Sequence, residues 1–262
     1  MRTGLALGGG GVYGAAHIAY LEVFEDFGIL PYVMSGTSSG AVIAALFAGG
    51  LCTKEIINLL DDVLVSKRSL FQRFTAMRKA GSIEAFARQF LLNALPCKIF
   101  EELRMPVKII AADFHSFEEK VFDKGDLLKA LMCSIALPKV IDPQQADGAY
   151  YIDGGAVNIV PFDVIRDDCD TLIAIDVSFL STKNLKPTAK NAARAAFAAT
   201  HRALMEQRMK NCPVELFERS YLGHTAALEF NRFKDIYMLA QAKKPAFAQK
   251  LKMIIERSSH NV

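Results

Sequence analysis

Short apolar runs and amphipathic segments alternate along the first fifty residues. Residues 5–7 and 32–35 are compact apolar runs that predict buried strands, and a glycine-rich turn follows each of them. Between these runs, Ile18, Leu21 and Phe24 recur at helical spacing with acidic residues on the other face, which predicts a helix. An alanine-rich helix is expected after the second strand. This order of elements is typical of α/β proteins.

The rest of the chain continues this pattern. We expect further strands over residues 106–112, 120–122, 150–152 and 171–177, and a late strand over residues 235–239. We expect helices over residues 53–104, 126–133 and 246–257. The first region should be interrupted near Ser66–Ser69, at Gly81 and at Pro96, with N-caps at Thr53 and Ser82. Because the run at 171–177 is apolar throughout, it suits a parallel sheet that is covered on both faces. The expected fold class is therefore α/β with three layers: a mostly parallel central sheet with helices on both faces.

Length and composition favour one domain. The 262 residues contain no repeat, low-complexity tract or linker, so we expect a single domain over residues 1–262. Hydrophobic residues make up 52% of the chain, which excludes a disordered protein and supplies a sizeable core. The same apolar excess is compatible with a protein that handles an apolar ligand.

Charge is distributed unevenly along the chain. Residues 1–180 hold 16 Lys and Arg against 22 Asp and Glu, whereas residues 181–262 hold 15 against 6. The basic C-terminal part predicts either solvated helix faces or peripheral contact with an anionic membrane surface. Residues 67–74, which combine basic residues with Phe, are a second candidate for membrane contact. No nucleic-acid partner is expected, because neither a basic–aromatic sheet pattern nor a zinc-finger spacing occurs.

The sequence also predicts the compartment. No apolar run approaches the length of a membrane span, and residues 40–51 form the longest candidate. The N-terminus leads directly into the first predicted strand and has no signal-peptide pattern. Five cysteines without a C-x-x-C pair indicate a reduced chain with no disulfide framework and no zinc ribbon. We therefore expect a cytoplasmic protein, peripheral at the membrane if it binds one.

The segment Gly36-Thr37-Ser38-Ser39-Gly40 matches G-x-S-x-G, the nucleophile elbow. A serine on a sharp strand-to-helix turn needs very small residues two positions before and after it, and Gly36 and Gly40 supply them. The helix that follows offers free N–H groups and a positive dipole end for an oxyanion. An ordinary glycine-rich turn is the alternative interpretation. The predicted strand before the motif and helix after it favour Ser38 as a nucleophile.

A glycine-rich loop, residues 8–14 (GGGGVYG), follows the first predicted strand. Gly9, Gly11 and Gly14 also satisfy the G-x-G-x-x-G dinucleotide fingerprint. A dinucleotide site requires an acidic residue at the end of the second strand, and residues 33–36 contain none. Successive glycine N–H groups can instead surround the oxygen of a carbonyl under attack. We favour this oxyanion loop over a nucleotide-binding site.

A serine nucleophile needs a base. The five histidines lack a distinguishing context and are expected to be structural: His17, His115, His201, His224 and His260. Asp153 differs, because it ends a short aromatic-rich strand and the following Gly154 and Gly155 leave the approach to it open. Asp-Gly is also an ordinary turn dipeptide, so a structural role for Asp153 stays open.

The glycine loop, Gly-Thr-Ser-Ser-Gly and Asp-Gly-Gly, in this order, resemble the patatin-like phospholipase family. Residues 14–21 look like the family's first helix, residues 134–138 like the segment before its second motif block, and residues 151–161 like that block. The resemblance covers about residues 3–178. Residues 181–262 carry no signature of the family and are expected to form a basic, mainly helical C-terminal extension.

The resemblance implies a patatin-like fold and a serine acyl hydrolase that cleaves lipid carboxyl esters, as a phospholipase A or lysophospholipase does. It implies a Ser-Asp dyad, in which Ser38 is the nucleophile and Asp153 accepts its proton, with no metal and no cofactor. It implies an oxyanion hole formed by backbone N–H groups, and further glycines that support the motifs. The implied donors are Gly9, Gly10 and Gly11, and the supporting glycines are Gly14, Gly36, Gly40, Gly154 and Gly155.

One position departs from the family pattern. Family members usually carry Arg or Lys where this chain has Tyr13. Tyrosine cannot supply that charge, which affects head-group preference and rate but not the backbone oxyanion hole. The departure supports an alternative function: a weakly active or non-enzymatic lipid-binding regulatory protein on the same scaffold.

Overall fold

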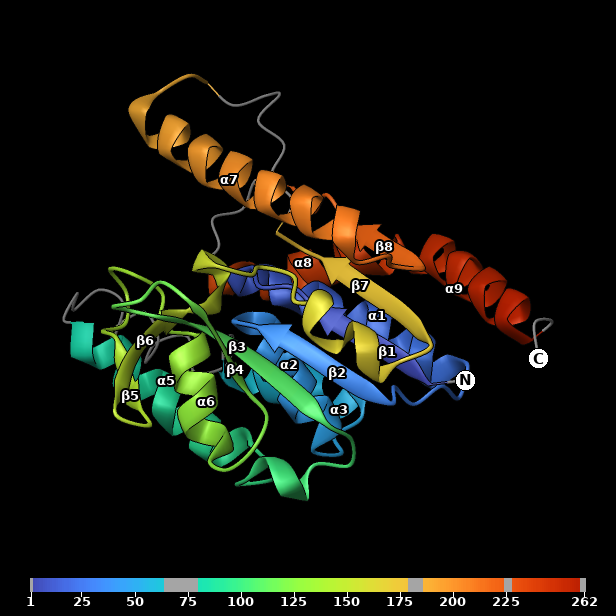
Figure 1. Ribbon diagram of the computed structural model, residues 1–262, viewed down its shortest axis with the longest axis horizontal. Coiled ribbons are helices and arrows are strands. Elements are labelled where there is room, and N and C mark those ends of the chain that lie inside the picture. Colours follow the sequence, from blue (N-terminus) through green and yellow to red (C-terminus); the bar gives the residue numbers. More distant parts are fainter. Residues whose placement is uncertain (1, 64–79, 179–185, 224–227, 260–262) are drawn as a thin grey trace.

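The computed structural model describes residues 2–63, 80–178, 186–223 and 228–259. The segment 67–74 and the break expected near Ser66–Ser69 lie outside these residues. The strands are β1 (Thr3–Leu7), β2 (Val33–Thr37), β3 (Val107–Asp113), β4 (Glu119–Phe122), β5 (Gln144–Ala146), β6 (Ala149–Asp153), β7 (Thr171–Asp176) and β8 (Leu216–Arg219). The α-helices are α1 (Ala15–Asp26), α2 (Ser39–Ala48), α3 (Thr53–Asp61), α5 (Ala80–Ala94), α6 (Leu127–Ser134), α7 (Ala189–Asn211), α8 (Phe233–Gln241) and α9 (Lys244–Ser259) (Figure 1).

Short 3₁₀ helices complete the described elements. They are η1 (Gly11–Gly14), η3 (Phe100–Glu102), η4 (Gly154–Ala156), η5 (Asp163–Asp168) and η6 (Phe230–Arg232). No helix in the described part of the chain is long and apolar enough to cross a membrane.

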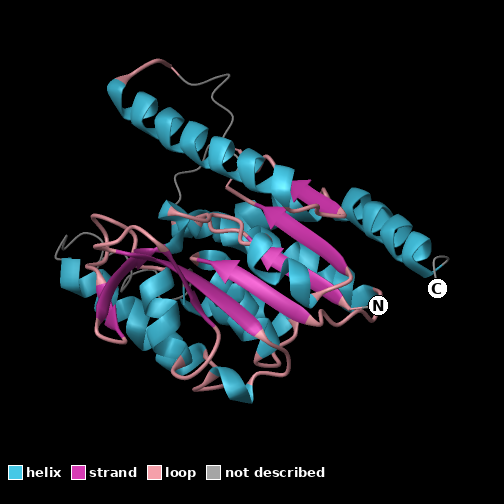
Figure 2. Cartoon of the chain, in the orientation of Figure 1, coloured by secondary structure: helices cyan, strands magenta, loops and turns pink. Residues whose placement is uncertain are grey.

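One eight-stranded sheet forms the centre of the molecule (Figure 2). Its order is β5-β6-β3-β2-β1-β7-β8, and β4 pairs with β3. The strands β3, β2, β1, β7 and β8 run parallel to one another, whereas β4, β5 and β6 make antiparallel pairs. The expected mostly parallel sheet is confirmed, with antiparallel strands on one side of it.

Two strands share one edge of β3. Thr37, at the end of β2, pairs with Ile110, and Asp153, at the end of β6, pairs with the next residue, Ala111. β4 pairs with both Ile110 and Ala111. Since a strand residue has only two edges, β2 and β6 must meet end to end along the edge opposite β4. The ends of two strands that are far apart in sequence are therefore neighbours.

Both faces of the sheet are covered, as the apolar strands require. Leu5 and Leu7 of β1 belong to a core cluster with α1, α2, α6 and α8, whereas Ala6 belongs to a second cluster on the opposite face. That second cluster includes Phe162, Ile165 and, on α7, Met205. The expected three layers are confirmed, with η5 and the C-terminal half of α7 covering the second face.

Helix α1 is enclosed between the sheet and the C-terminal helices. The ring of Phe247 on α9 lies 4.9 Å from that of Tyr20 and 6.3 Å from that of Phe24. Glu22 accepts a hydrogen bond from Tyr237 on α8 at 2.5 Å and pairs with Lys244 on α9 at 3.0 Å. Much of the C-terminal extension is thus part of the core of the domain.

The late strand expected over residues 235–239 is wrong. α8 occupies this position, because Phe233, Ile236 and Ala240 recur at helical spacing and are buried. β5 and β8 have no counterpart among the expected strands. Each is only three or four residues long, and intermediate or exposed residues interrupt its buried positions.

Two expectations about helix boundaries are also wrong. α5 already includes Gly81 and Ser82, so Ser82 is not an N-cap. The residues before Ala80 lie outside the described part of the chain, so the break expected at Gly81 stays a prediction. Cys52, rather than Thr53, is the N-cap of α3. The carboxylate of Glu55 accepts the N–H of Cys52 at 2.8 Å, a reciprocal cap that a Cys-Thr sequence does not suggest.

Truncation of Phe247 tests the enclosure of α1. Phe247 is 1% exposed, so we expect Phe247→Ala to lower the free energy of unfolding by about 3–5 kcal/mol through lost burial and a cavity. Urea denaturation measures the change. Met238→Ala is the control, because Met238 is 64% exposed on the neighbouring helix. Equal effects of the two substitutions would show that α9 is not part of the core.

Candidate active site

Ser38 occupies the turn between β2 and α2. Its backbone angles, φ 53° and ψ −122°, lie outside the regions that residues with side chains favour. The close approach of the chain to itself explains the flanking glycines. A Cβ at Gly40 would lie 2.1 Å from the carbonyl oxygen of Leu7, and a Cβ at Gly36 would lie 2.6 Å from the backbone of Ala41. Any larger residue at either position would disrupt this turn.

The structure brings Ser38 and Asp153 into contact. The hydroxyl of Ser38 donates to Oδ2 of Asp153 at an O···O distance of 2.6 Å. The other carboxylate oxygen, Oδ1, accepts the N–H of Gly155 at 2.8 Å. The backbone N–H of Ser38 donates to Oγ of Ser134 at 2.9 Å. Both members of the pair are therefore fixed by further hydrogen bonds.

Burial gives Asp153 the basicity that a free carboxylate lacks. Asp153 is 5% exposed, and this desolvation raises its pKa to about 6. The hydrogen bonds from Ser38 and Gly155 stabilise the ionised form and oppose that rise. At neutral pH Asp153 is mainly ionised, and it is a stronger base than an exposed aspartate.

Residues 158–161 connect the two halves of the site. The carbonyl of Asn158 accepts the hydroxyl of Thr37 at 2.7 Å, and the carbonyl of Ile159 accepts the N–H of Gly9 at 2.9 Å. This segment follows Asp153 by only a few residues and contacts both β2, which ends just before Ser38, and the glycine loop. It therefore fixes the position of Asp153 relative to Ser38.

The glycine loop lies beside Ser38. A Cβ at Gly9 would lie 3.2 Å from Cβ of Ser38 and 2.9 Å from Cδ1 of Ile159, so glycine provides space there. The N–H of Gly9 already donates to the carbonyl of Ile159, so it is not free for an oxyanion. Gly9 was expected from the sequence to be one of the oxyanion donors, and the structure differs on this point. Within the described residues, the N–H groups of Gly10 and Gly11 donate to no protein acceptor. These two groups are the available donors of the loop.

Two further glycines of the motifs are required by close packing. A Cβ at Gly14 would lie 2.7 Å from Cβ of Ser39, and a Cβ at Gly154 would lie 2.3 Å from the carbonyl oxygen of Ile110. Gly14 thus allows η1 to approach α2. Gly154 allows the Asp153 turn to approach β3.

Within the described part of the chain, His17 and His115 make no hydrogen bond with Ser38 or Asp153. His17 is fully buried, and its Nε2–H donates to the carbonyl of Gly8 at 2.7 Å. Burial lowers the pKa of His17 to about 4, so it is neutral and supports the glycine loop. His115 lies in a turn after β3, where its backbone N–H donates to Asp113. His224 and His260 are outside the described residues.

His201 is a site residue that sequence reasoning missed. It is 8% exposed and lies within hydrogen-bonding reach of the Gly155 backbone, two residues from Asp153. Burial lowers its pKa. No local motif marks His201, because its proximity to the dyad arises from the packing of α7.

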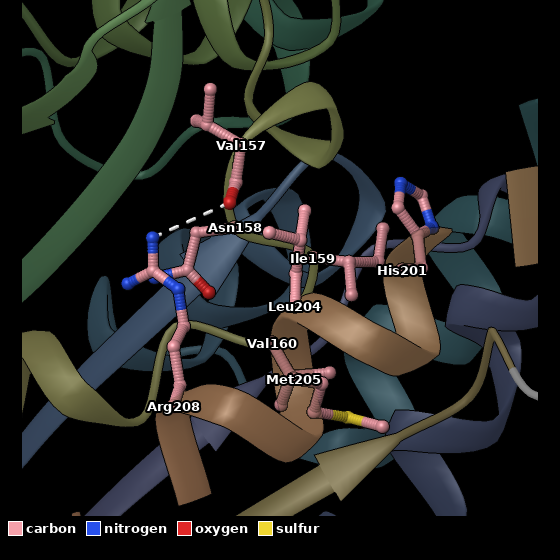
Figure 3. A pocket seen from close by; sticks show the side chains of 8 residues that line it. All are labelled: Val157, Asn158, Ile159, Val160, His201, Leu204, Met205 and Arg208. Atoms are coloured by element: carbon pink, nitrogen blue, oxygen red, sulfur yellow. Dashed lines mark hydrogen bonds between the residues drawn. The ribbon is translucent and has the colours of Figure 1, made fainter. Parts of the chain in front are cut away.

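The C-terminal half of α7 forms one wall beside the site (Figure 3). His201, Leu204, Met205 and Arg208 face residues 157–160 across a cavity of only about 10 Å³. Arg208 donates to the carbonyl of Val157 at 3.4 Å and pairs with Glu119 at 3.1 Å and with Asp163. α7 is thus anchored directly behind the Asp153 turn.

Tyr13 also contacts the C-terminal extension. Its hydroxyl donates to the carbonyl of Gly223 at 3.3 Å. The residue that replaces the family's usual cation therefore connects the glycine loop to the segment after β8.

Replacing Asp153 tests the electrostatic cost of the site. The pKa of Asp153 is about 6 when folded against an ordinary value of 3.8, so the folded state binds the proton more tightly. The free energy of unfolding then falls as pH rises from about 4 to about 6, by on the order of 2 kcal/mol. Asn does not titrate, so the free energy of unfolding of Asp153→Asn should rise by that amount relative to wild type as pH increases from 4 to 8. Urea denaturation at the two pH values measures this change.

Asp113→Asn is the matched control. The N–H groups of Ser116 and His115 lower the pKa of this exposed carboxyl. Its contribution to stability is lost only as pH falls below about 4, so Asp113→Asn should change stability little between pH 4 and pH 8 and in the opposite direction below pH 4. If Asp153→Asn changed stability equally at both pH values, burial would not be raising its pKa.

Comparisons with known proteins show the family of this chain. The model of the patatin-like phospholipase family matches residues 5–166. The patatin-like phospholipase domain-containing protein ZK370.4 of Caenorhabditis elegans is 32% identical over 199 residues, which are 70% of this chain and 14% of that protein. The uncharacterized NTE family protein Mb1092c of Mycobacterium bovis is 31% identical over 186 residues, which are 68% of this chain and 49% of that protein.

This chain spans less than half the length of these two relatives. Among solved structures, VipD from Legionella pneumophila has a TM-score of 0.48 at 13% identity, over 94% of this chain and 67% of that chain. The family model covers more than half of the chain, including the glycine loop, Ser38 and Asp153. The chain belongs to the patatin-like phospholipase family.

Proposed function

We propose that this protein is a serine acyl hydrolase that cleaves lipid carboxyl esters through a Ser38–Asp153 dyad. The observation that carries the proposal is the 2.6 Å hydrogen bond from the Ser38 hydroxyl to a buried carboxylate. Serine becomes a nucleophile when a base can take its proton as it attacks. Family membership supports an ester of a lipid as the substrate class.

In the acylation step, Oγ of Ser38 attacks the ester carbonyl carbon while its proton passes to Oδ2 of Asp153. The carbonyl oxygen becomes an oxyanion, which the free N–H groups of Gly10 and Gly11 stabilise as preorganised donors. The tetrahedral intermediate then expels the alcohol oxygen, which takes the proton from Asp153. The products of this step are a free alcohol and an acyl ester on Ser38.

Deacylation repeats the chemistry with water. Asp153 accepts a proton from a water molecule as the water oxygen attacks the acyl carbon. Collapse of the second tetrahedral intermediate breaks the bond to Oγ of Ser38, which regains the proton from Asp153. Ester and water have then become acid and alcohol, and the dyad has returned to its initial state.

Labelling of the serine tests this proposal. A fluorophosphonate reacts with an activated serine hydroxyl, so we expect wild-type protein to be labelled at Ser38 and Ser38→Ala to lose labelling. Ser38→Ala and Asp153→Asn should each lower kcat for p-nitrophenyl ester hydrolysis by about 10³-fold or more. Mass spectrometry locates the adduct, and steady-state kinetics measure kcat.

Ser39→Ala is the matched control for the labelling. Its hydroxyl is buried and has no hydrogen-bond partner among the described residues, and the substitution keeps Cβ. We expect this variant to retain both labelling and turnover. A wild-type protein that is folded but takes no label would favour the alternative, a lipid-binding regulatory protein with lost catalysis.

The pH dependence of turnover provides a separate test. Asp153 must be ionised to accept a proton, and its pKa is about 6. The value of kcat/KM for a neutral ester should therefore rise as pH increases through about 6 and be constant above it. A profile that is flat between pH 5 and pH 7 would exclude Asp153 as the base.

A further inference from the structure

The N-terminal half of α7, with the residues just before it, has no core to pack on. We call residues 186–200 the overhanging segment. Among its residues with described side chains none is buried, and Phe197 is 56% exposed. Figure 1 shows this half of α7 extending away from the rest of the described chain. Residues 192–199 nevertheless consist of six alanines, one arginine and one phenylalanine. Such an exposed apolar helix indicates a binding surface.

The overhanging segment carries charge of one sign. Residues 186–200 contain three basic residues, Lys186, Lys190 and Arg194, and no Asp or Glu. Elsewhere in the C-terminal extension, cations pair with carboxylates of the domain. Lys244 contacts Glu22, and Lys250 contacts Glu218, at 3.0 and 2.8 Å. The segment therefore combines cations with small apolar residues and a phenylalanine, as helices that lie at an anionic lipid interface do.

The overhanging segment adjoins the dyad. The ring of Phe197 lies 3.8 Å from that of His201, and His201 contacts the backbone of Gly155. The amide of Gly155 in turn donates to Asp153. The twelve helical residues before His201 extend about 18 Å from this point. A surface bound along the segment would thus be held next to Ser38 and Asp153.

We propose that the overhanging segment docks on the surface of an anionic lipid bilayer and holds the dyad close to its ester bonds. The cations attract the anionic head groups, and Phe197 with the alanines enters the interface. That the bilayer also supplies the substrate rests on the proposed function. Docking itself is independent of hydrolysis.

Vesicle co-sedimentation of the Ser38→Ala chain tests docking without lipid turnover. We expect binding to phosphatidylcholine vesicles that contain phosphatidylglycerol, weakening with added salt, and much less binding to phosphatidylcholine alone. Each cation near an anionic surface contributes about fivefold in affinity, so Lys190→Gln with Arg194→Gln should weaken binding by roughly 30-fold. Phe197→Ala should weaken it further.

Lys234→Gln with Lys252→Gln is the matched control. It removes the same charge from exposed positions on α8 and α9, and we expect binding within about twofold of that of the parent chain. Circular dichroism and thermal melting confirm that each variant is folded. Glutamine is a good helix former, so loss of the helix would not explain weaker binding.

Three results would overturn this inference. The first is equal binding to vesicles with and without phosphatidylglycerol. The second is that the control pair of substitutions weakens vesicle binding as much as Lys190→Gln with Arg194→Gln does. The third is that light scattering finds the parent chain self-associated and the Phe197→Ala chain monomeric. The last result would assign the segment to a second copy of the chain. If the wild-type chain binds the vesicles but takes no fluorophosphonate label, that result would contradict the hydrolase proposal alone.

Discussion

The hydrogen bond between Ser38 and Asp153 exists because β2 and β6 end at adjacent residues of β3. Thr37 pairs with Ile110 and Asp153 with Ala111, so the residue after one strand meets the last residue of the other. The remaining features of the site depend on this meeting. The glycines allow the two turns to approach, and residues 158–161 hold them in register through carbonyl contacts.

This arrangement places several unfavourable features in a small volume. Ser38 has positive φ, the charge of Asp153 is buried, and Nδ1 of His17 is buried with no hydrogen-bond partner among the residues that the structure describes. Each of these costs free energy that packing elsewhere must offset. The enclosure of α1 by α8 and α9 supplies such packing, because Phe247 and the hydrogen bonds to Glu22 connect the last helices to the helix behind the glycine loop.

Ion pairs within the domain join the acidic part of the sequence, residues 1–180, to the basic part, residues 181–262. Lys244 binds Glu22, Arg219 binds Asp176 and Arg208 binds Glu119. The C-terminal extension thus neutralises carboxylates of residues 1–180 while it covers α1 and the second face of the sheet. The overhanging segment is different, since its stretch of sequence brings cations without carboxylates.

The sequence by itself determined the α/β class and most strands through apolar periodicity. It marked Ser38 through a turn so tight that only glycine fits at Gly36 and Gly40, whereas Asp153 was singled out by the resemblance to the patatin-like family. Only the tertiary structure decided the contact between Ser38 and Asp153, the raised pKa of Asp153, the engagement of the Gly9 N–H and the place of His201. Each of these depends on segments that are distant in sequence, since burial and strand register are set by packing and leave no local pattern to read.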